Sequence, residues 1–109
     1  MSTTANFEYI PGLWTLQVIV AAEVDESTSF SVLLTFADGY RAVVSLAGRG
    51  TRPLAVVLRE PALFRELSVD AALNTITWPN GYDIDPDRLR MLAIEQHPED
   101  PAAIPSVLR

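Results

Sequence analysis

The chain has 109 residues, of which 49% are hydrophobic, and it carries a formal net charge of −6. This length suits one ordinary domain, and the apolar share is high enough to bury a core, which excludes extensive disorder. The sequence contains no cysteine and no lysine, so disulfides, thiolate metal sites and lysine Schiff bases are excluded. No apolar run is long enough to cross a bilayer, and Met1 to Asn6 lacks the basic start of a secretory signal. We therefore expect a cytoplasmic protein without a membrane partner.

Residues 1–60, 61–82 and 83–109 each carry a net negative charge, so none of these three segments is basic. A nucleic-acid phosphate backbone would be repelled by such a surface, so we expect no nucleic-acid binding by this chain alone. An acidic surface suits a small basic protein as partner, while mild acidity is also explained by solubility. A protein partner is the prediction that we carry forward.

Apolar and polar residues alternate along the first half of the chain, which is the period of half-buried strands. The pattern predicts three consecutive strands over residues 16–25, 29–36 and 40–46. Asp38-Gly39 is expected to form the turn between the last two, because glycine adopts positive φ without steric cost. Short turns between consecutive strands favour an antiparallel meander. In the first strand, the side chains expected to face the core are Leu16, Val18, Val20, Ala22 and Val24.

The second half of the chain predicts shorter elements. Leu54 to Leu58 is an apolar run that fits either a strand or a helix, and Pro61 suits the first position of a short helix. Two short strands are expected on either side of Ala71-Ala72. Asp85 is a good N-cap for the last helix, since Pro86 then takes the first helical position. The predicted fold is α+β, with a mainly antiparallel sheet: a β-meander first, a short strand pair later, one short helix and one C-terminal helix.

The expected domain organisation is simple. Residues 1–15 form a lead-in, residues 16–97 a single α+β domain, and residues 98–109 a proline-rich tail that docks weakly or is disordered. Large apolar side chains at strand and helix positions predict the core, which is expected to contain Leu34, Phe36, Phe64, Ile76, Trp78 and Leu89.

The most distinctive stretch runs from Trp78 to Asp87 and reads Trp-Pro-Asn-Gly-Tyr-Asp-Ile-Asp-Pro-Asp. It joins a strand end, a turn and a helix start. Together with the runs over residues 33–39 and 58–64, it resembles a small bacterial family known only as domain of unknown function 2442. The resemblance covers roughly residues 16–90. The loop over residues 48–53 and the extension beyond Leu89 depart from the family pattern.

The resemblance implies a compact α+β fold with a mainly antiparallel sheet. Genes of such domains often lie beside another small gene, and some members have been proposed as the antitoxin-like half of a pair. Some members carry an added helix-turn-helix domain, which this chain lacks. The family has no established catalytic residues, so the resemblance implies none here.

Three alternating aspartates and the single histidine could be read as metal ligands, but neither fits a known type of metal site well. Asp83, Asp85 and Asp87 alternate as in a calcium loop, but the sixth position of such a loop needs glycine and is Arg88. His97 is the single histidine, and with no cysteine a zinc site would be largely carboxylate. We therefore predict no metal, no cofactor and no catalytic residue. The residues that carry the family resemblance are expected to be structural, and they are Asp38, Gly39, Trp78, Pro79, Asn80, Gly81, Asp83, Ile84, Asp85 and Pro86.

Three functions compete at this stage. The leading hypothesis is a non-enzymatic protein-interaction module, antitoxin-like, that binds through an exposed sheet edge or through tail residues Ile104, Val107 and Leu108. A transcription-associated regulator is the second, although the sequence has no basic helix. A small-molecule-binding domain is the third. Pairing with a second copy of the chain is compatible with all three, since dimers commonly cover sheet edges.

Overall fold

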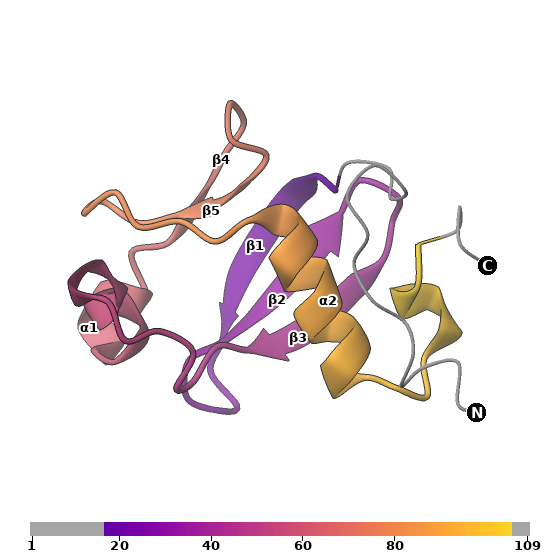
Figure 1. Cartoon of the computed structure of the whole chain (residues 1–109), viewed down its shortest axis with the longest axis horizontal. Helices are drawn as coiled ribbons and strands as arrows, with labels where there is room; N and C mark the ends of the chain where they lie inside the picture. Colours follow the sequence, from indigo (N-terminus) through magenta and orange to yellow (C-terminus); the bar gives the residue numbers. More distant parts are fainter. Residues whose placement is uncertain (1–16, 106–109) are drawn as a thin grey trace.

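The computed structural model describes residues 17–105 and has the α+β fold that the sequence predicts (Figure 1). A three-stranded antiparallel sheet has the order β1-β2-β3, and a separate two-stranded sheet pairs β4 with β5. Helix α2 crosses one face of the larger sheet, and α1 lies near the smaller sheet, on the side of the molecule away from α2. The strands are β1 (Ile19–Asp25), β2 (Ser31–Phe36), β3 (Arg41–Ser45), β4 (Ser68–Asp70) and β5 (Thr75–Thr77). The helices are α1 (Pro61–Phe64) and α2 (Pro86–Gln96), with 3-10 turns η1 (Pro53–Leu58) and η2 (Pro101–Ala103).

A β-bulge near the start of β1 makes the predicted orientation of the residues before it wrong. The register with β2 shifts between Ile19 and Ala21, so Val20 has no partner of its own. The extra residue reverses which side chains face the core. Ile19 is buried, whereas Val20, expected to face inward, is 54% exposed. Ala22 and Val24, which follow the bulge, pack against the core as predicted.

The core lies between the meander, α2 and the elements that connect them. All six side chains predicted for it are at most 2% exposed, which confirms that part of the analysis. The apolar run over 54–58, which periodicity left open, forms the 3-10 turn η1, and its buried side chains join the same core. The buried residues from the sheet are Ile19, Val32, Leu34, Phe36, Val44 and Leu46, and those from α2 are Leu89, Leu92 and Ala93.

Each outer edge of the meander is occupied in part. On β3, the Gln96 side chain accepts from the backbone N–H of Ser45 at 2.8 Å and donates to its carbonyl at 3.0 Å. His97 Nε2 lies 2.7 Å from the carbonyl oxygen of Val43. On β1, the backbone N–H of Ile19 donates to Asn74 O in the β4–β5 hairpin at 2.9 Å. Side chains and a hairpin thus occupy polar groups that would otherwise template strand addition.

The start of α2 follows the predicted capping. Asp85 Oδ1 accepts from the backbone N–H of Asp87 at 2.8 Å, and Pro86 occupies the first helical position. Pro98 follows the helix end, as expected. The described part of the tail, residues 98–105, forms η2, and Ala103 is buried. Among residues 17–105, no helix is long and apolar enough to span a membrane.

Replacing Asp85 by alanine is expected to lower the free energy of unfolding by about 1 kcal/mol, because it removes the cap of α2. Urea unfolding followed by circular dichroism measures this difference. Asp83→Ala is the matched control: this carboxylate is also exposed and makes no side-chain hydrogen bond in the described structure, so its change should stay within about 0.5 kcal/mol. Equal losses from the two variants would contradict the capping role.

Candidate functional site

The residues that carry the family resemblance fall into two groups that the fold keeps apart. The first group is Asp38 and Gly39 at the β2–β3 turn. Gly39 has φ 94°, which confirms the predicted need for glycine at the turn. Asp38 accepts two hydrogen bonds from Arg90 of α2, at 3.1 Å and 2.9 Å.

Arg90 is fully buried and organises this end of the molecule. Its guanidinium lies over both the Phe36 and Tyr40 rings, 4.7 Å and 4.6 Å from their centroids, and the two rings stack on each other with centroids 6.0 Å apart. Nε donates to the carbonyl of Ala103 at 2.6 Å, Nη2 to that of Ala102 at 3.1 Å, and Nη1 to Gln17 Oε1 at 3.1 Å. One side chain therefore joins the β2–β3 turn, η2 and the entry to β1. Burial raises the pKa of the neighbouring Tyr40 hydroxyl.

The second group, residues 78–86, forms a braced turn. Trp78 Nε1 donates to Phe64 O at 3.1 Å, which confirms the expected carbonyl partner. Asn80 Oδ1 accepts from the backbone N–H of Tyr82 at 3.0 Å, and its Nδ2 donates to Leu54 O at 2.9 Å. Gly81 has φ 91°. The carbonyl of Ile84 accepts from Thr75 Oγ1. Pro79 is exposed, and Asp83 forms a β-bridge with Thr77. Asp85 and Pro86 form the start of α2.

The aspartates of this turn do not converge. Asp85 caps α2, and Asp87 Oδ1 accepts from the backbone N–H of Gln17 at 3.1 Å. Within the described part of the chain, no group of three or more His, Asp or Glu side chains could hold a metal ion.

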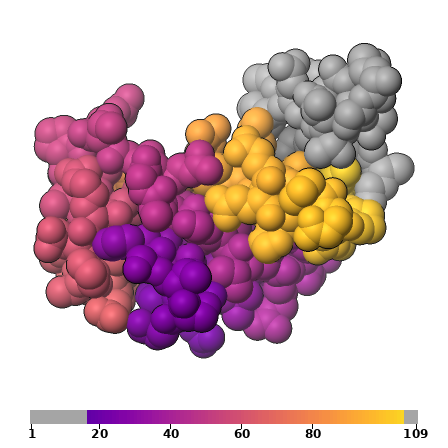
Figure 2. Space-filling view, turned by 90° about the horizontal axis from the view of Figure 1, so that it is seen from below, coloured from indigo at the N-terminus to yellow at the C-terminus, as the bar shows by residue number. Residues whose placement is uncertain are grey.

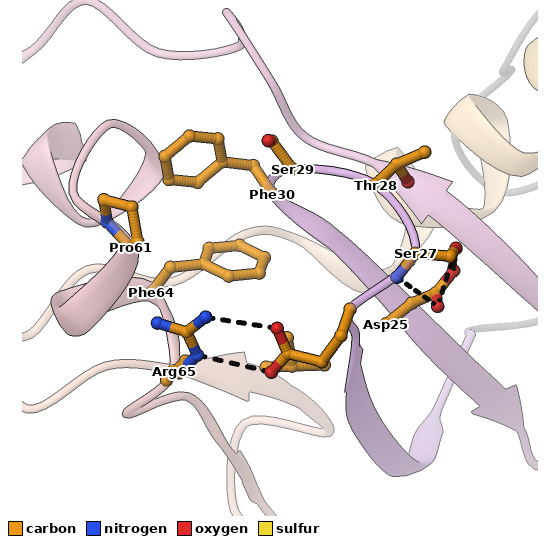
Figure 3. Close-up of a pocket in the computed structure, with 10 residues that line it drawn as sticks. Asp25, Ser27, Thr28, Ser29, Phe30, Pro61, Phe64 and Arg65 are labelled. Atoms are coloured by element: carbon orange, nitrogen blue, oxygen red, sulfur yellow. Dashed lines mark hydrogen bonds and ion pairs between the residues drawn. The ribbon is translucent and has the colours of Figure 1, made fainter.

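The candidate functional site is a groove between the β1–β2 loop and α1 (Figure 3). Its volume is about 310 Å³. The rings of Phe30 and Phe64 lie edge to face, with centroids 5.4 Å apart. Val24 and Pro61 add to the apolar part of the wall, and Ser27, Thr28 and Ser29 form its polar loop side. Figure 2 shows the indigo end of β1 directly beside the rose segment that carries α1.

Charged side chains set the polarity of the groove. Arg65 Nε and Nη2 donate to the two carboxylate oxygens of Glu26, at 3.2 Å and 3.1 Å, across the gap between α1 and the loop. These hydrogen bonds and the positive charge of Arg65 lower the pKa of the Glu26 carboxyl. The pair is exposed, so it fixes geometry more than it adds stability. Asp25 accepts from the backbone and hydroxyl of Ser27, which shapes the loop.

Phe30 enters the groove from an unusual backbone conformation. Its φ of 56° lies in the left-handed region, which a bulky L-residue adopts at a cost of about 1–2 kcal/mol. The backbone N–H of Leu46 donates to the carbonyl of Phe30 at 2.8 Å, so the sheet holds the residue in place. Strained residues concentrate at functional sites, and this one orients an aromatic ring into the groove.

Sequence reasoning missed the main features of both regions. It did not predict the pairing of Glu26 with Arg65. It gave Arg90 no role. A signal was present for Arg90, since Pro86, Arg90 and Ile94 recur every four residues and all three are buried. None of the ten residues expected to be structural lines the groove, but Pro61 and Phe64 of the run over residues 58–64, which also carries the resemblance, do line it. Trp78 packs against Phe64 with ring centroids 6.0 Å apart.

The meander, the strand pair and the capped α2 define a small α+β domain. A family model described as "Protein of unknown function (DUF2442)" matches residues 20–95. Since the match spans more than half of the chain, the protein belongs to this family. No curated protein and no solved structure matches it. The function must therefore be argued from the groove and its surroundings.

Proposed function

We propose that this protein is a non-enzymatic interaction module that holds a segment of a basic protein partner in the groove between the β1–β2 loop and α1. The observation that carries the proposal is the chemistry of that groove: two phenyl rings inside a hollow of about 310 Å³, with carboxylates at its rim. The proposed setting is the cytoplasm, and the proposed role is that of an antitoxin-like half of a protein pair.

The groove fits an apolar anchor residue flanked by a basic one. Apolar side chains that fill a pocket supply most of the binding energy at interfaces, and Phe30 and Phe64 offer such a pocket. Asp25 lies at the rim, where its carboxylate attracts an approaching lysine or arginine, while the charge of Glu26 is balanced by its ion pair with Arg65. The net charge of −6 acts in the same direction over longer distances.

The contacts already made at both sheet edges favour partner binding in the groove over addition of a partner strand. Gln96 and His97 already occupy the outward polar groups of Ser45 and Val43 on β3. The β4–β5 hairpin is bonded to the start of β1. A partner that adds a strand would first have to displace these contacts, whereas the groove is open. Of the tail residues expected to bind a partner, Ile104 is half-buried, and Val107 and Leu108 lie outside the described residues.

The test is co-expression of the chain with the product of the gene adjacent to its own, followed by affinity capture and mass spectrometry. Ser29→Trp places a large ring at the groove, where Ser29 is exposed and makes no hydrogen bond in the described structure. Ala71→Trp adds the same ring at the exposed β4–β5 turn and is the control. Circular dichroism verifies that both variants fold.

We expect a stoichiometric complex with the unmodified chain and with Ala71→Trp, and its loss with Ser29→Trp. No complex at all would overturn the interaction module, and a complex that tolerates Ser29→Trp would overturn the groove as its site. Light scattering on the chain alone separates a third outcome, in which a second copy of the same chain fills the groove.

A further inference from the structure

Three arginines from distant parts of the chain gather around Tyr82, away from the groove. Arg49 and Arg88 line one small hollow with Tyr82, and its volume is about 100 Å³. Arg52 lines a second and more open hollow, which also has Tyr82 in its wall and has a volume of about 420 Å³. All three guanidinium groups are exposed, and within the described residues none forms a hydrogen bond or an ion pair.

The loop that carries Arg49 and Arg52 is held close to Tyr82. A side chain at Gly50 would lie 2.5 Å from Ala55 Cβ and 3.3 Å from the Tyr82 hydroxyl, so only glycine allows this approach. Arg59 Nη1 donates to the carbonyl of Gly50 at 2.9 Å and fixes the loop from the other side. The two hollows are thus bounded by a braced loop, which lowers the cost of ordering them around a ligand.

Backbone donors of this loop flank Arg49 and Arg52 in the chain, although their residues do not themselves line the hollows. The N–H groups of Gly48, Gly50 and Thr51 donate to no other group in the described structure. Free backbone N–H groups beside arginines form the usual environment of bound oxyanions. Asp83 is the single carboxylate along the two hollows, so arginine outnumbers it three to one. This local excess stands out on a chain whose net charge is −6.

We propose that these hollows bind a small phosphorylated molecule. The hollow between Arg49 and Arg88 has the size and charge to take the phosphate group. The adjoining hollow, with Arg52, half-exposed Leu54 and one face of Tyr82, takes the remainder of the molecule. A planar base or ring suits this second hollow, because aromatic and guanidinium planes both stack on such groups. The site shares no lining residue with the groove and is independent of the proposed partner.

The test is a titration with inorganic phosphate, pyrophosphate and adenosine monophosphate, followed by amide NMR shifts and calorimetry. Arg88→Gln removes one charge from the phosphate hollow. Arg41→Gln removes the same charge from exposed β3, where Arg41 contacts only Thr35 Oγ1, and serves as the matched control. We expect saturable shifts at Gly48, Gly50 and Thr51, with affinity about tenfold weaker in Arg88→Gln and unchanged in Arg41→Gln.

Comparing the affinity for adenosine monophosphate with that for inorganic phosphate shows whether the site recognises a nucleotide or a phosphate group alone. Tighter binding than inorganic phosphate, with shifts extending to Leu54 and Gly81, supports a nucleotide-like ligand across both hollows. Equal affinity supports recognition of the phosphate group alone. Absence of saturable binding of all three probes up to about 10 mM would overturn the proposal, as would equal weakening by Arg88→Gln and Arg41→Gln, which indicates only diffuse attraction.

Discussion

Replacing Arg90 by alanine is expected to lower the free energy of unfolding by about 3–5 kcal/mol, the range found when one partner of a buried ion pair is removed. The guanidinium is fully buried, so its loss leaves a cavity over the stacked rings of Phe36 and Tyr40. It also leaves the carbonyls of Ala102 and Ala103 and the Gln17 side chain without their donor. Urea unfolding of the full chain, followed by circular dichroism, measures the loss.

Arg41→Ala is the control for the Arg90 prediction, because its side chain is exposed and its removal should change stability by less than about 0.5 kcal/mol. Asp38→Asn tests the pair from the other side. It keeps the shape of the side chain but removes the charge facing Arg90, so a substantial loss is expected here too. Asp38→Asn with the stability of the unmodified chain would show that ring stacking and the tail carbonyls alone hold Arg90.

The elements that sequence patterns predicted correctly are those fixed by neighbours in the chain. Alternation specified β2 and β3, and Asp38-Gly39 specified their turn, because strand period and positive φ are local properties. The start of α2 followed from Asp85 and Pro86 for the same reason. The face of β1 was predicted wrongly because one unpaired residue, Val20, reverses the alternation, and a bulge depends on the register with β2.

The sites could not be predicted because they are built from residues that are far apart in the sequence. Arg90 meets Asp38 across 52 positions, and Arg65 meets Glu26 across 39. The cluster of Arg49, Arg52 and Arg88 could not be predicted from the charge of long segments, because Arg88 lies in an acidic segment and joins the other two only in the fold. Local sequence patterns predict the residues that form turns and helix caps. The groove and the arginine cluster form only when folding brings distant segments together.

The turn over residues 78–86 links stability to the groove through one ring. Trp78 packs against Phe64 on one side and Tyr82 on the other, with ring centroids 6.0 Å and 5.7 Å away. Phe64 in turn packs against Phe30 in the groove. Tyr82 lines both arginine-lined hollows. A change at Trp78 is therefore expected to reach both surfaces as well as the core.

Replacing Trp78 by alanine is expected to lower the free energy of unfolding by about 3–5 kcal/mol, because it empties a large buried site. Trp78→Phe keeps an aromatic ring but is smaller and removes one of the two donors to the carbonyl of Phe64, which still accepts from the backbone N–H of Leu67 at 3.2 Å, so it should cost less, about 1–3 kcal/mol. Urea unfolding ranks the two variants. Leu73→Ala, at a 48% exposed position in the β4–β5 turn, is the control and should change little.

Because Trp78→Phe should remain folded, it also tests the link between the core and the two surfaces. Amide shifts are expected to change at Phe30 in the groove and at Gly50 beside Tyr82, positions that Trp78 reaches only through Phe64 and Tyr82. Changes confined to the neighbours of Trp78 would show that the groove and the arginine cluster are shaped independently of the braced turn. The residues of the family resemblance would then support the fold without setting the geometry of either proposed binding site.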